Sequence, residues 1–294
     1  MPAADSISVP VTDSRKPRDD EIDVYGVTHP GRVRKDNQDH FLVCALRKQM
    51  VIQLTSLPDA DHLMGDGERL AFLAMVADGV GGGAKGGEAS RVALEAVTQY
   101  VTRSMRCYYA GAAAGDQEFT DALQEAARQG HEELLRRGEE DVDFRGMATT
   151  LTLYLGVWPR AYLLQVGDSR CYVLRHGELA QITRDQTMAQ ELVDAGVMPQ
   201  DVAAGTRLAH TLSSSIGGRQ TDPKVTRFDM KWGHVVLLCS DGLTRHVPDD
   251  RIRDKLLSMT SAKQVCEDLL QEALDDGGSD NITIVVGRPL QREG

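Results

Sequence analysis

The amino-acid sequence predicts an α+β domain built in layers. Strand-like stretches occur in runs and helical stretches are grouped between them, whereas a parallel βαβ sheet would need a regular alternation of the two. A chain of 294 residues, 41% of them hydrophobic, is long enough for one large core. We expect a single domain over residues 22–288, a flexible polar tail before it (1–21) and a short tail after it (289–294).

Strands and two long helices fill the first half of this domain. Period-two or continuous apolar stretches predict the strands, and the last of these leads straight into Asp78. Apolar residues at helical spacing predict two amphipathic helices side by side. The expected elements are strands at 22–31, 39–46 and 70–77 and helices at 88–105 and 116–137.

The second half returns to strands and closes with two more helices. Its first four strands are joined by the tight turns WPR, GDSR and HG, which predicts a single antiparallel meander. A short helix and loops over 184–207 interrupt the strands. The expected elements are strands at 147–158, 161–166, 171–176, 178–183, 224–230, 234–240 and 281–287 and helices at 248–258 and 262–276.

Charge and cysteine pattern narrow the class of function. A formal net charge of −11 opposes a sequence-independent grip on nucleic acid, because that grip needs Lys and Arg to neutralise phosphates. Apolar runs such as VVLLC have strand length, far short of a bilayer span, and the N-terminus lacks the apolar core of a secretory signal. Five cysteines without metal-type spacing predict buried thiols. We expect a cytoplasmic protein that binds neither nucleic acid nor membrane.

Four aspartates share one setting, a polar turn at the mouth of an apolar strand: Asp78, Asp168, Asp241 and Asp280. Such carboxylates can converge at one edge of a sandwich, where they repel one another unless cations lie among them. Oxygen-only ligands select hard ions such as Mg2+, Mn2+ or Ca2+, and two such ions can activate a water for attack on phosphorus. The alternative for each aspartate is a turn residue that bonds its own backbone, and spacing alone leaves both interpretations open.

The glycine-rich stretch around Asp78, MVADGVGGGAKGG, has two possible explanations. Gly81, Gly83 and Gly86 match GxGxxG, the outline of a dinucleotide-binding loop, but antiparallel strands follow where that fold needs a parallel unit. The sequence also opposes a loop that binds a nucleoside triphosphate, because Lys85 is followed by Gly rather than Ser or Thr. We therefore expect bare backbone that lets metal, water and substrate approach closely, with one glycine carbonyl as a candidate ligand.

Six short motifs, in order RKDNQD, VADGVGGG, GMATTLTL, VGDSRCYVL, CSDGL and SDNITIVV, resemble those of the metal-dependent protein serine/threonine phosphatases of the 2C family. The resemblance covers roughly residues 22–287 and is greatest to the compact bacterial members. It implies a four-layer α-β-β-α sandwich with two central antiparallel β-sheets. It also implies hydrolysis of phosphoserine and phosphothreonine by direct attack of a metal-bridging hydroxide, with two Mn2+ or Mg2+ ions and a weaker third ion.

This resemblance implies a metal-binding role for five residues. Asp78 would bridge the two ions, and the carbonyl of Gly79 would bind one of them. Asp241 and Asp280 would complete the ligand set, and Asp168 corresponds to the carboxylate that holds the third ion.

Other residues would act around the metals. Asp39 would hold a coordinated water, Arg34 would bind the substrate phosphate through its guanidinium fork, and Asn281 would orient the ligands. Val80 stands where many eukaryotic members have a proton-donating histidine, so a metal-bound water is our first candidate for that donor. Gln38 stands where glutamate is frequent, and we expect this change to weaken metal binding somewhat.

Positions that depart from the family's usual residues, together with inserted segments, indicate where the substrate could be selected. Arg245 replaces a residue that is often acidic after SDGLT, and Ser214 stands where the family usually has arginine. The insert 184–207 corresponds to the mobile flap of bacterial members and is our candidate for substrate recognition. The long connection 47–68 is a candidate second contact surface.

The expected partners are phosphorylated Ser/Thr proteins and a cognate Ser/Thr kinase, and we expect the protein to be a monomer. The alternative is a catalytically inactive pseudophosphatase that binds phosphoproteins without metals. Retention of all four strand-mouth aspartates opposes that alternative, because an unfilled carboxylate cluster costs stability.

Overall fold

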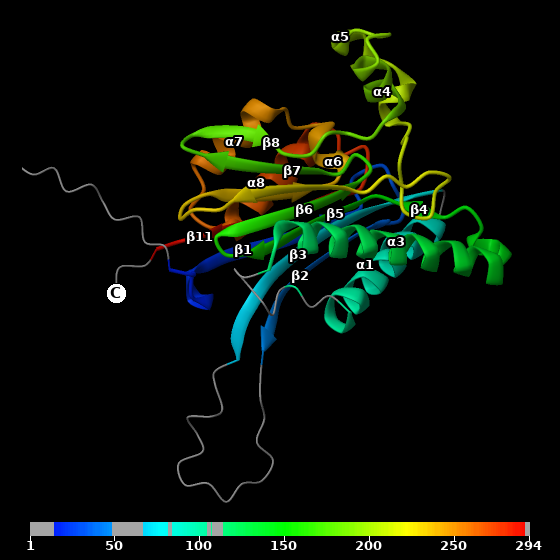
Figure 1. Ribbon diagram of the computed structural model, residues 1–294. Helices are drawn as coiled ribbons and strands as arrows, with labels where there is room; N and C mark the ends of the chain where they lie inside the picture. Colours follow the sequence, from blue (N-terminus) through cyan, green and yellow to red (C-terminus); the bar gives the residue numbers. More distant parts are fainter. Residues whose placement is uncertain (1–14, 49–66, 82–83, 105–106, 108–113, 292–294) are drawn as a thin grey trace, which may run out of the picture.

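The computed structural model describes residues 15–48, 67–81, 84–104, 107 and 114–291. Two antiparallel β-sheets pack face to face with helices outside, which confirms the predicted α+β four-layer sandwich (Figure 1). The five-stranded sheet has the order β1 (Ile22–His29), β11 (Ile282–Pro289), β10 (Val235–Cys239), β7 (Arg170–Arg175) and β8 (Glu178–Gln181). The six-stranded sheet has the order β2 (Asp39–Lys48), β3 (Glu68–Val80), β5 (Leu151–Val157), β6 (Arg160–Val166) and β9 (Lys224–Asp229), and β4 (Ala148–Thr149) pairs with β3.

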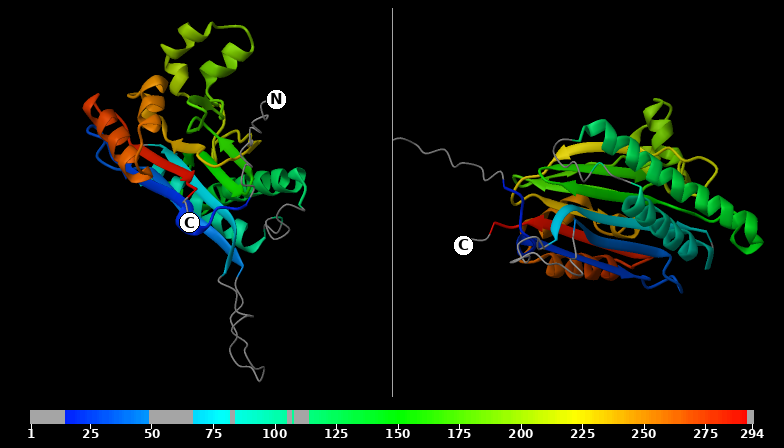
Figure 2. Two further views of the ribbon diagram at one scale, coloured as in Figure 1. Left: turned by 90° about the vertical axis from the view of Figure 1, so that its left-hand side faces the viewer. Right: turned by 60° about the horizontal axis from the view of Figure 1, so that its bottom comes forward.

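Helices cover both outer faces of the sandwich (Figure 2). Outside the six-stranded sheet lie α1 (Ala84–Arg103) and α3 (Asp116–Glu140), and outside the five-stranded sheet lie α7 (Asp249–Leu257) and α8 (Ala262–Asp275). The shorter helices are α4 (Met188–Asp194), α5 (Gln200–Ala204), α6 (Asp241–Thr244), η1 (Asp19–Glu21), η4 (Val142–Phe144) and η5 (Arg207–His210). Within the described ranges, none of the helices has both the length and the apolar character that a bilayer crossing requires.

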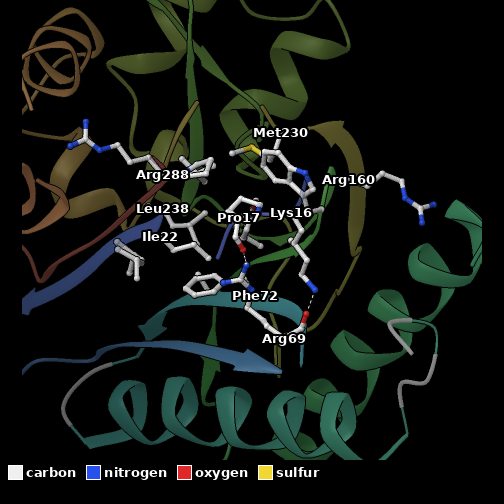
Figure 3. A pocket seen from close by; sticks show the side chains of 18 residues that line it. Lys16, Pro17, Ile22, Arg69, Phe72, Arg160, Met230, Leu238 and Arg288 are labelled. Carbon is white, nitrogen blue, oxygen red and sulfur yellow. Dashed lines mark hydrogen bonds between the residues drawn. The ribbon is translucent and has the colours of Figure 1, made fainter. Parts of the chain in front are cut away.

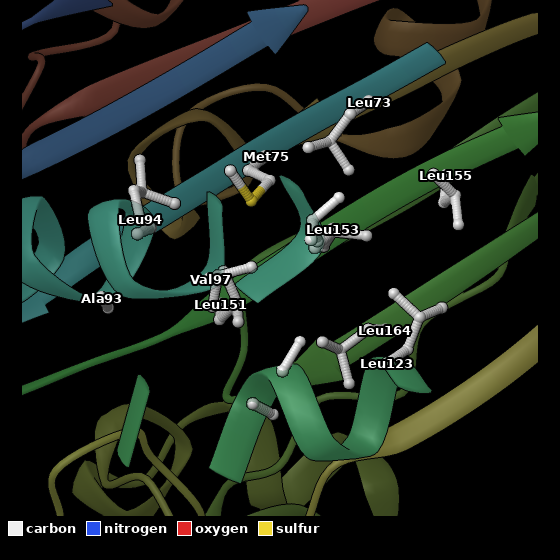
Figure 4. Packing of buried hydrophobic residues seen from close by; sticks show 14 of the residues in the cluster. Leu73, Met75, Ala93, Leu94, Val97, Leu123, Leu151, Leu153, Leu155 and Leu164 are labelled. Atoms are coloured by element: carbon white, nitrogen blue, oxygen red, sulfur yellow. The ribbon is translucent and has the colours of Figure 1, made fainter. Parts of the chain in front are cut away.

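Three separate layers of buried apolar side chains hold the sandwich together. In β10, Val235 and Leu237 face the helices, whereas Val236 and Leu238 face the other sheet. Because both faces of this strand are buried, its sequence is a continuous apolar run rather than an alternation. Each such side chain contributes about 1.5–3 kcal/mol when fully buried. Figure 4 shows the layer between the six-stranded sheet and its helices, which includes Leu73, Met75, Val97, Leu123 and Leu153.

The turn VGDSR carries the chain from one sheet to the other, so the predicted single meander is wrong. Strands β5 and β6 pair in the six-stranded sheet, whereas β7 and β8 pair in the five-stranded sheet. A period of two residues shows which side chains share a face, but it does not show which sheet a strand joins. The crossing leaves Asp168 in the turn where the chain changes sheets.

Residues 15–21 pack against the domain, although the sequence predicts a flexible tail through residue 21. Glu21 is fully buried, and its carboxylate accepts hydrogen bonds from the Arg15 guanidinium at 2.6 and 2.7 Å and from the Arg18 backbone N–H at 2.8 Å. Packing against the domain therefore includes residues that precede the predicted boundary at Ile22. The polar composition of residues 15–21 does not indicate this packing, because the contact that anchors them is a charge pair and not an apolar contact.

The same segment closes a cavity of about 90 Å3 between the two sheets (Figure 3). Pro17 and Lys16 line this cavity together with apolar side chains of both sheets, such as Phe72 and Leu238. Arg69 donates a hydrogen bond to the carbonyl of Pro17, and the Lys16 ammonium donates to the carbonyl of Arg69. These contacts close the end of the sandwich at which β3 begins.

Replacing Glu21 with Gln tests this anchor. The Arg15 hydrogen bonds, as the largest cause, lower the pKa of Glu21 from 4.5 to about 2, so the stabilisation is complete above pH 4.5 and is lost as the pH falls toward 2. We expect Glu21→Gln to lower Tm at pH 7 by about 2–4 °C. Thermal unfolding of both proteins from pH 7 downwards should show this difference shrinking below pH 4.5. A difference in Tm between the two proteins that is the same at every pH would contradict the interpretation that a charge pair anchors this segment.

Candidate metal centre

Five aspartates come together at one edge of the sandwich. Asp39 opens β2 and is paired in register with Asp78 near the end of β3. Asp168 lies in the turn between β6 and β7, Asp241 begins α6 directly after β10, and Asp280 precedes β11. Burial, followed by the negative charges of the other four aspartates, raises the pKa of Asp78 well above its usual value. The structure thus brings the four strand-mouth aspartates to one place and adds Asp39 to them.

Two hydroxyl groups hold Asp39 in one orientation. Its side chain is 2% exposed, and one carboxylate oxygen accepts hydrogen bonds from Ser240 Oγ at 2.7 Å and Thr283 Oγ1 at 2.8 Å. The other oxygen, Oδ1, is buried and has no hydrogen-bond partner among the described residues. Burial raises the pKa of Asp39 to about 6, although both hydroxyl bonds act to lower it. Ser240 and Thr283 are not among the predicted site residues, and their only signal in the sequence is their place beside the aspartates in CSDG and DNIT.

Thr150 connects Asp78 to the turn that carries Asp168. Its hydroxyl oxygen accepts a hydrogen bond from the Asp78 backbone N–H at 2.9 Å and lies 2.7 Å from Ser169 Oγ. Gly167 has a φ of +100°, and a Cβ there would lie 2.7 Å from the Thr150 methyl group. This tight turn buries Asp168, and burial, with the charge of Asp241 next, raises the pKa of Asp168 to about 8.

Two arginines neutralise part of this negative charge. Arg34 and Arg245 each donate a hydrogen bond to Oδ2 of Asp280 at 2.8 Å, and Arg245 also donates to Oδ2 of Asp241. Burial nevertheless raises the pKa of Asp241, against the effect of Arg245. Arg34, the predicted phosphate ligand, thus contacts a carboxylate oxygen here. Among the described residues, no three His, Cys, Asp or Glu side chains are arranged so that they could hold a metal ion as they stand. This agrees with the contacts of Asp241 and Asp280, whose Oδ2 atoms accept hydrogen bonds from arginine.

The donor set nevertheless fits hard divalent cations. Asp39 and Asp241 each have one carboxylate oxygen, Oδ1, that is buried without a hydrogen-bond partner in the part of the chain that the structure describes. An unpaired buried oxygen costs about 1–3 kcal/mol, so these atoms favour a positively charged ligand. Oxygen ligands and repelling carboxylates are the environment that Mg2+ and Mn2+ prefer.

The glycines behind Asp78 allow a helix to pack closely against a strand end. A Cβ at Gly79 would lie 2.0 Å from the carbonyl oxygen of Gly86, in the first turn of α1. The glycine-rich loop after Asp78 is shorter than predicted, because α1 begins at Ala84, four residues before its predicted start at Glu88. Gly83 lies outside the described residues.

Asn281 ties the loop that carries Arg34 to the start of β11. Its side-chain oxygen accepts from the Gln38 N–H at 2.9 Å, and its amide donates to the carbonyls of Pro30 at 3.0 Å and Asp36 at 2.9 Å. The Gln38 amide itself donates to the carbonyl of Gly81 at 2.9 Å. Asn281 thereby positions the chain on both sides of Arg34.

The insert 184–207 forms α4 and α5, which project beyond the sandwich (Figure 1). Near the start of this insert, the side-chain oxygen of Gln186 accepts a hydrogen bond from the Gly167 N–H at 2.7 Å, so the base of the insert lies beside the turn that carries Asp168. The other candidate contact surface, 47–68, lies mostly outside the described residues.

Comparison with known proteins identifies the family. Residues 55–281 match the family model described as protein phosphatase 2C. This match covers more than half of the chain and contains Asp78, Asp168, Asp241 and Asp280. The chain therefore belongs to the protein phosphatase 2C family.

Relatives of known name support the assignment. The serine/threonine protein phosphatase PstP of Mycobacterium tuberculosis is 35% identical over 216 residues, which cover 74% of this chain and 40% of PstP. The serine/threonine phosphatase stp of Listeria monocytogenes is 29% identical over 226 residues, which cover 76% of this chain and 86% of stp. The crystal structure of the PstP catalytic domain with two manganese ions has a TM-score of 0.71 at 30% identity, and the similarity covers 92% of this chain and 99% of that domain. The chain thus spans less than half of the length of PstP.

Removing one repelling carboxylate should stabilise the protein in EDTA. Because the pKa of Asp168 is raised from 3.8 to about 8, the folded state holds a proton that the unfolded state has lost, and stability falls as the pH rises through this range. We expect Asp168→Asn to raise Tm by roughly 3–6 °C at pH 8, with a gain that grows from pH 4 and levels off above about pH 8. Thermal unfolding of the wild type and of Asp168→Asn from pH 4 to above pH 8 tests this expectation. A lower Tm for Asp168→Asn than for the wild type at pH 8 would contradict the repulsion among the carboxylates.

Proposed function

We propose that this protein is a metal-dependent phosphatase that hydrolyses phosphoserine and phosphothreonine in other proteins. The observation that carries this proposal is the cluster of five buried or half-buried aspartates with unpartnered oxygens beside Arg34. Names of relatives support the substrate class, and the manganese-bound catalytic domain of PstP supports a centre with two ions.

Within this function, the strand-end residues divide into ligands and supports. Asp78, Asp241, Asp280 and the carbonyl of Gly79 would hold two Mn2+ or Mg2+ ions, and Asp168 would hold a weaker third. When bound, such ions supply Lewis acidity and lower the pKa of a water for direct attack on phosphorus. Because the aspartates repel one another, the cluster favours cations over an apolar or anionic ligand.

Arg34 would bind the phosphate group of the substrate. Its side chain is 54% exposed and lies within hydrogen-bond distance of Asp280, so it can leave that carboxylate without unfolding any element. With Asp280 holding a cation, the attraction of this carboxylate for Arg34 would weaken, and the guanidinium fork would be available to bind two phosphate oxygens. Asp39, fixed by its two hydroxyl partners, would orient a water at the centre through Oδ1.

The setting of this activity follows from the same proposal. The substrates would be phosphorylated by a cognate Ser/Thr kinase, and the insert 184–207 would contact them as a mobile flap. The free thiols of Cys44, Cys171, Cys239 and Cys266 suit a reducing cytoplasm, and we propose that the protein acts there as a monomer.

Phosphate release from para-nitrophenyl phosphate and from a phosphothreonine peptide, with and without Mn2+, tests the function. We expect Mn2+-dependent release from both substrates, and Asp241→Asn should reduce the rate at least about 100-fold because it removes a charged ligand. Asp250→Asn on the exposed start of α7 is the matched control and should keep full activity. Hydrolysis that ignores Mn2+, or an unchanged rate in Asp241→Asn, would refute the proposal.

A further inference from the structure

Arg245 holds the same carboxylate oxygens that a metal ion would need. Its guanidinium donates to Oδ2 of Asp241 and, at 2.8 Å, to Oδ2 of Asp280. The other Asp280 oxygen accepts from the Asn281 backbone N–H at 2.9 Å, so both oxygens of this carboxylate are engaged. A divalent cation that binds Asp280 through Oδ2 must therefore share or displace a guanidinium N–H.

Local structure fixes the position of this arginine. Asp241 begins α6 and Arg245 caps its C-terminal end, and residues four apart on a helix lie on the same face. Asp280 lies in the loop before β11 and accepts from Nη1 of the guanidinium, whereas Asp241 accepts from Nη2. Arg245 thus bridges two carboxylates from separate elements, whereas Arg34 contacts only one of them among its described hydrogen bonds.

Burial makes this bridge stronger than an ordinary surface pair. The side chains of Arg245, Asp241 and Asp280 are 28%, 15% and 17% exposed, so water and salt screen their charges only in part. The charge of Arg245 also acts to lower the pKa of both Asp241 and Asp168. One cation thereby offsets repulsion among three of the aspartates.

We propose that Arg245 is an internal cation that competes with divalent metal ions for Asp241 and Asp280. It stabilises the carboxylate cluster before metal binds, and it raises the metal concentration at which the centre fills. This inference rests on the proposed function, because it assumes that these two aspartates bind the metal.

Calorimetric titration with Mn2+ and thermal unfolding in EDTA test this role without measuring activity. Arg245→Met should bind Mn2+ about three- to tenfold more tightly than the wild type, because the metal no longer displaces an ion pair. The same variant should have a lower Tm in EDTA, and saturating Mn2+ should raise its Tm by more than it raises that of the wild type. Arg245→Lys keeps the positive charge and should bind Mn2+ within about twofold of the wild type.

Arg251→Met is the matched control. Arg251 lies on α7, is 53% exposed and donates to Glu272 at 2.8 Å, so its loss should change neither Mn2+ affinity nor the response of Tm to Mn2+. Equal or weaker Mn2+ binding by Arg245→Met, with the wild type binding normally, would overturn the competition alone. Absence of Mn2+ binding by every folded variant would overturn the proposed function together with this inference.

Discussion

Mutual repulsion among carboxylates at one edge of the sandwich is the constraint on which the site depends. Asp78 and Asp39 face each other in register on β3 and β2, and three further aspartates arrive from other elements. Burial and neighbouring charge raise the pKa of Asp78, which means that the fold holds these groups together at a cost. Such an arrangement persists only where the surrounding structure is rigid and cations are available to offset the charge.

The two-sheet architecture supplies that rigidity. Strands such as β10 are buried on both faces, so the apolar layers on their two sides, rather than the site itself, fix their ends. Hydroxyl groups then orient the carboxylates: Ser240 and Thr283 hold Asp39, and Thr150 connects Asp78 to the turn before β7. Arg34 and Arg245 supply part of the positive charge that offsets the repulsion among these carboxylates.

Much of the fold was predictable because buried strands and amphipathic helices leave periodic patterns. The four strand-mouth aspartates were also visible, since each ends or precedes an apolar run next to a turn residue. The errors have a common cause. The predicted single meander is wrong at the turn that carries Asp168, because a strand's sheet membership leaves no periodic signal. The predicted end of the tail differs at Glu21, because a charge pair between residues six apart leaves no periodic signal either.

The sequence by itself determined the class of fold, the order of the elements and the four aspartates at strand ends, because these follow from local pattern and residue chemistry. Only the tertiary structure decided that Asp39 is held by Ser240 and Thr283, and that Arg245 bridges Asp241 and Asp280. Those partners are far apart along the chain, apart from Asp241 and Arg245. Their contacts depend on how the two sheets pack, and no local pattern records that packing.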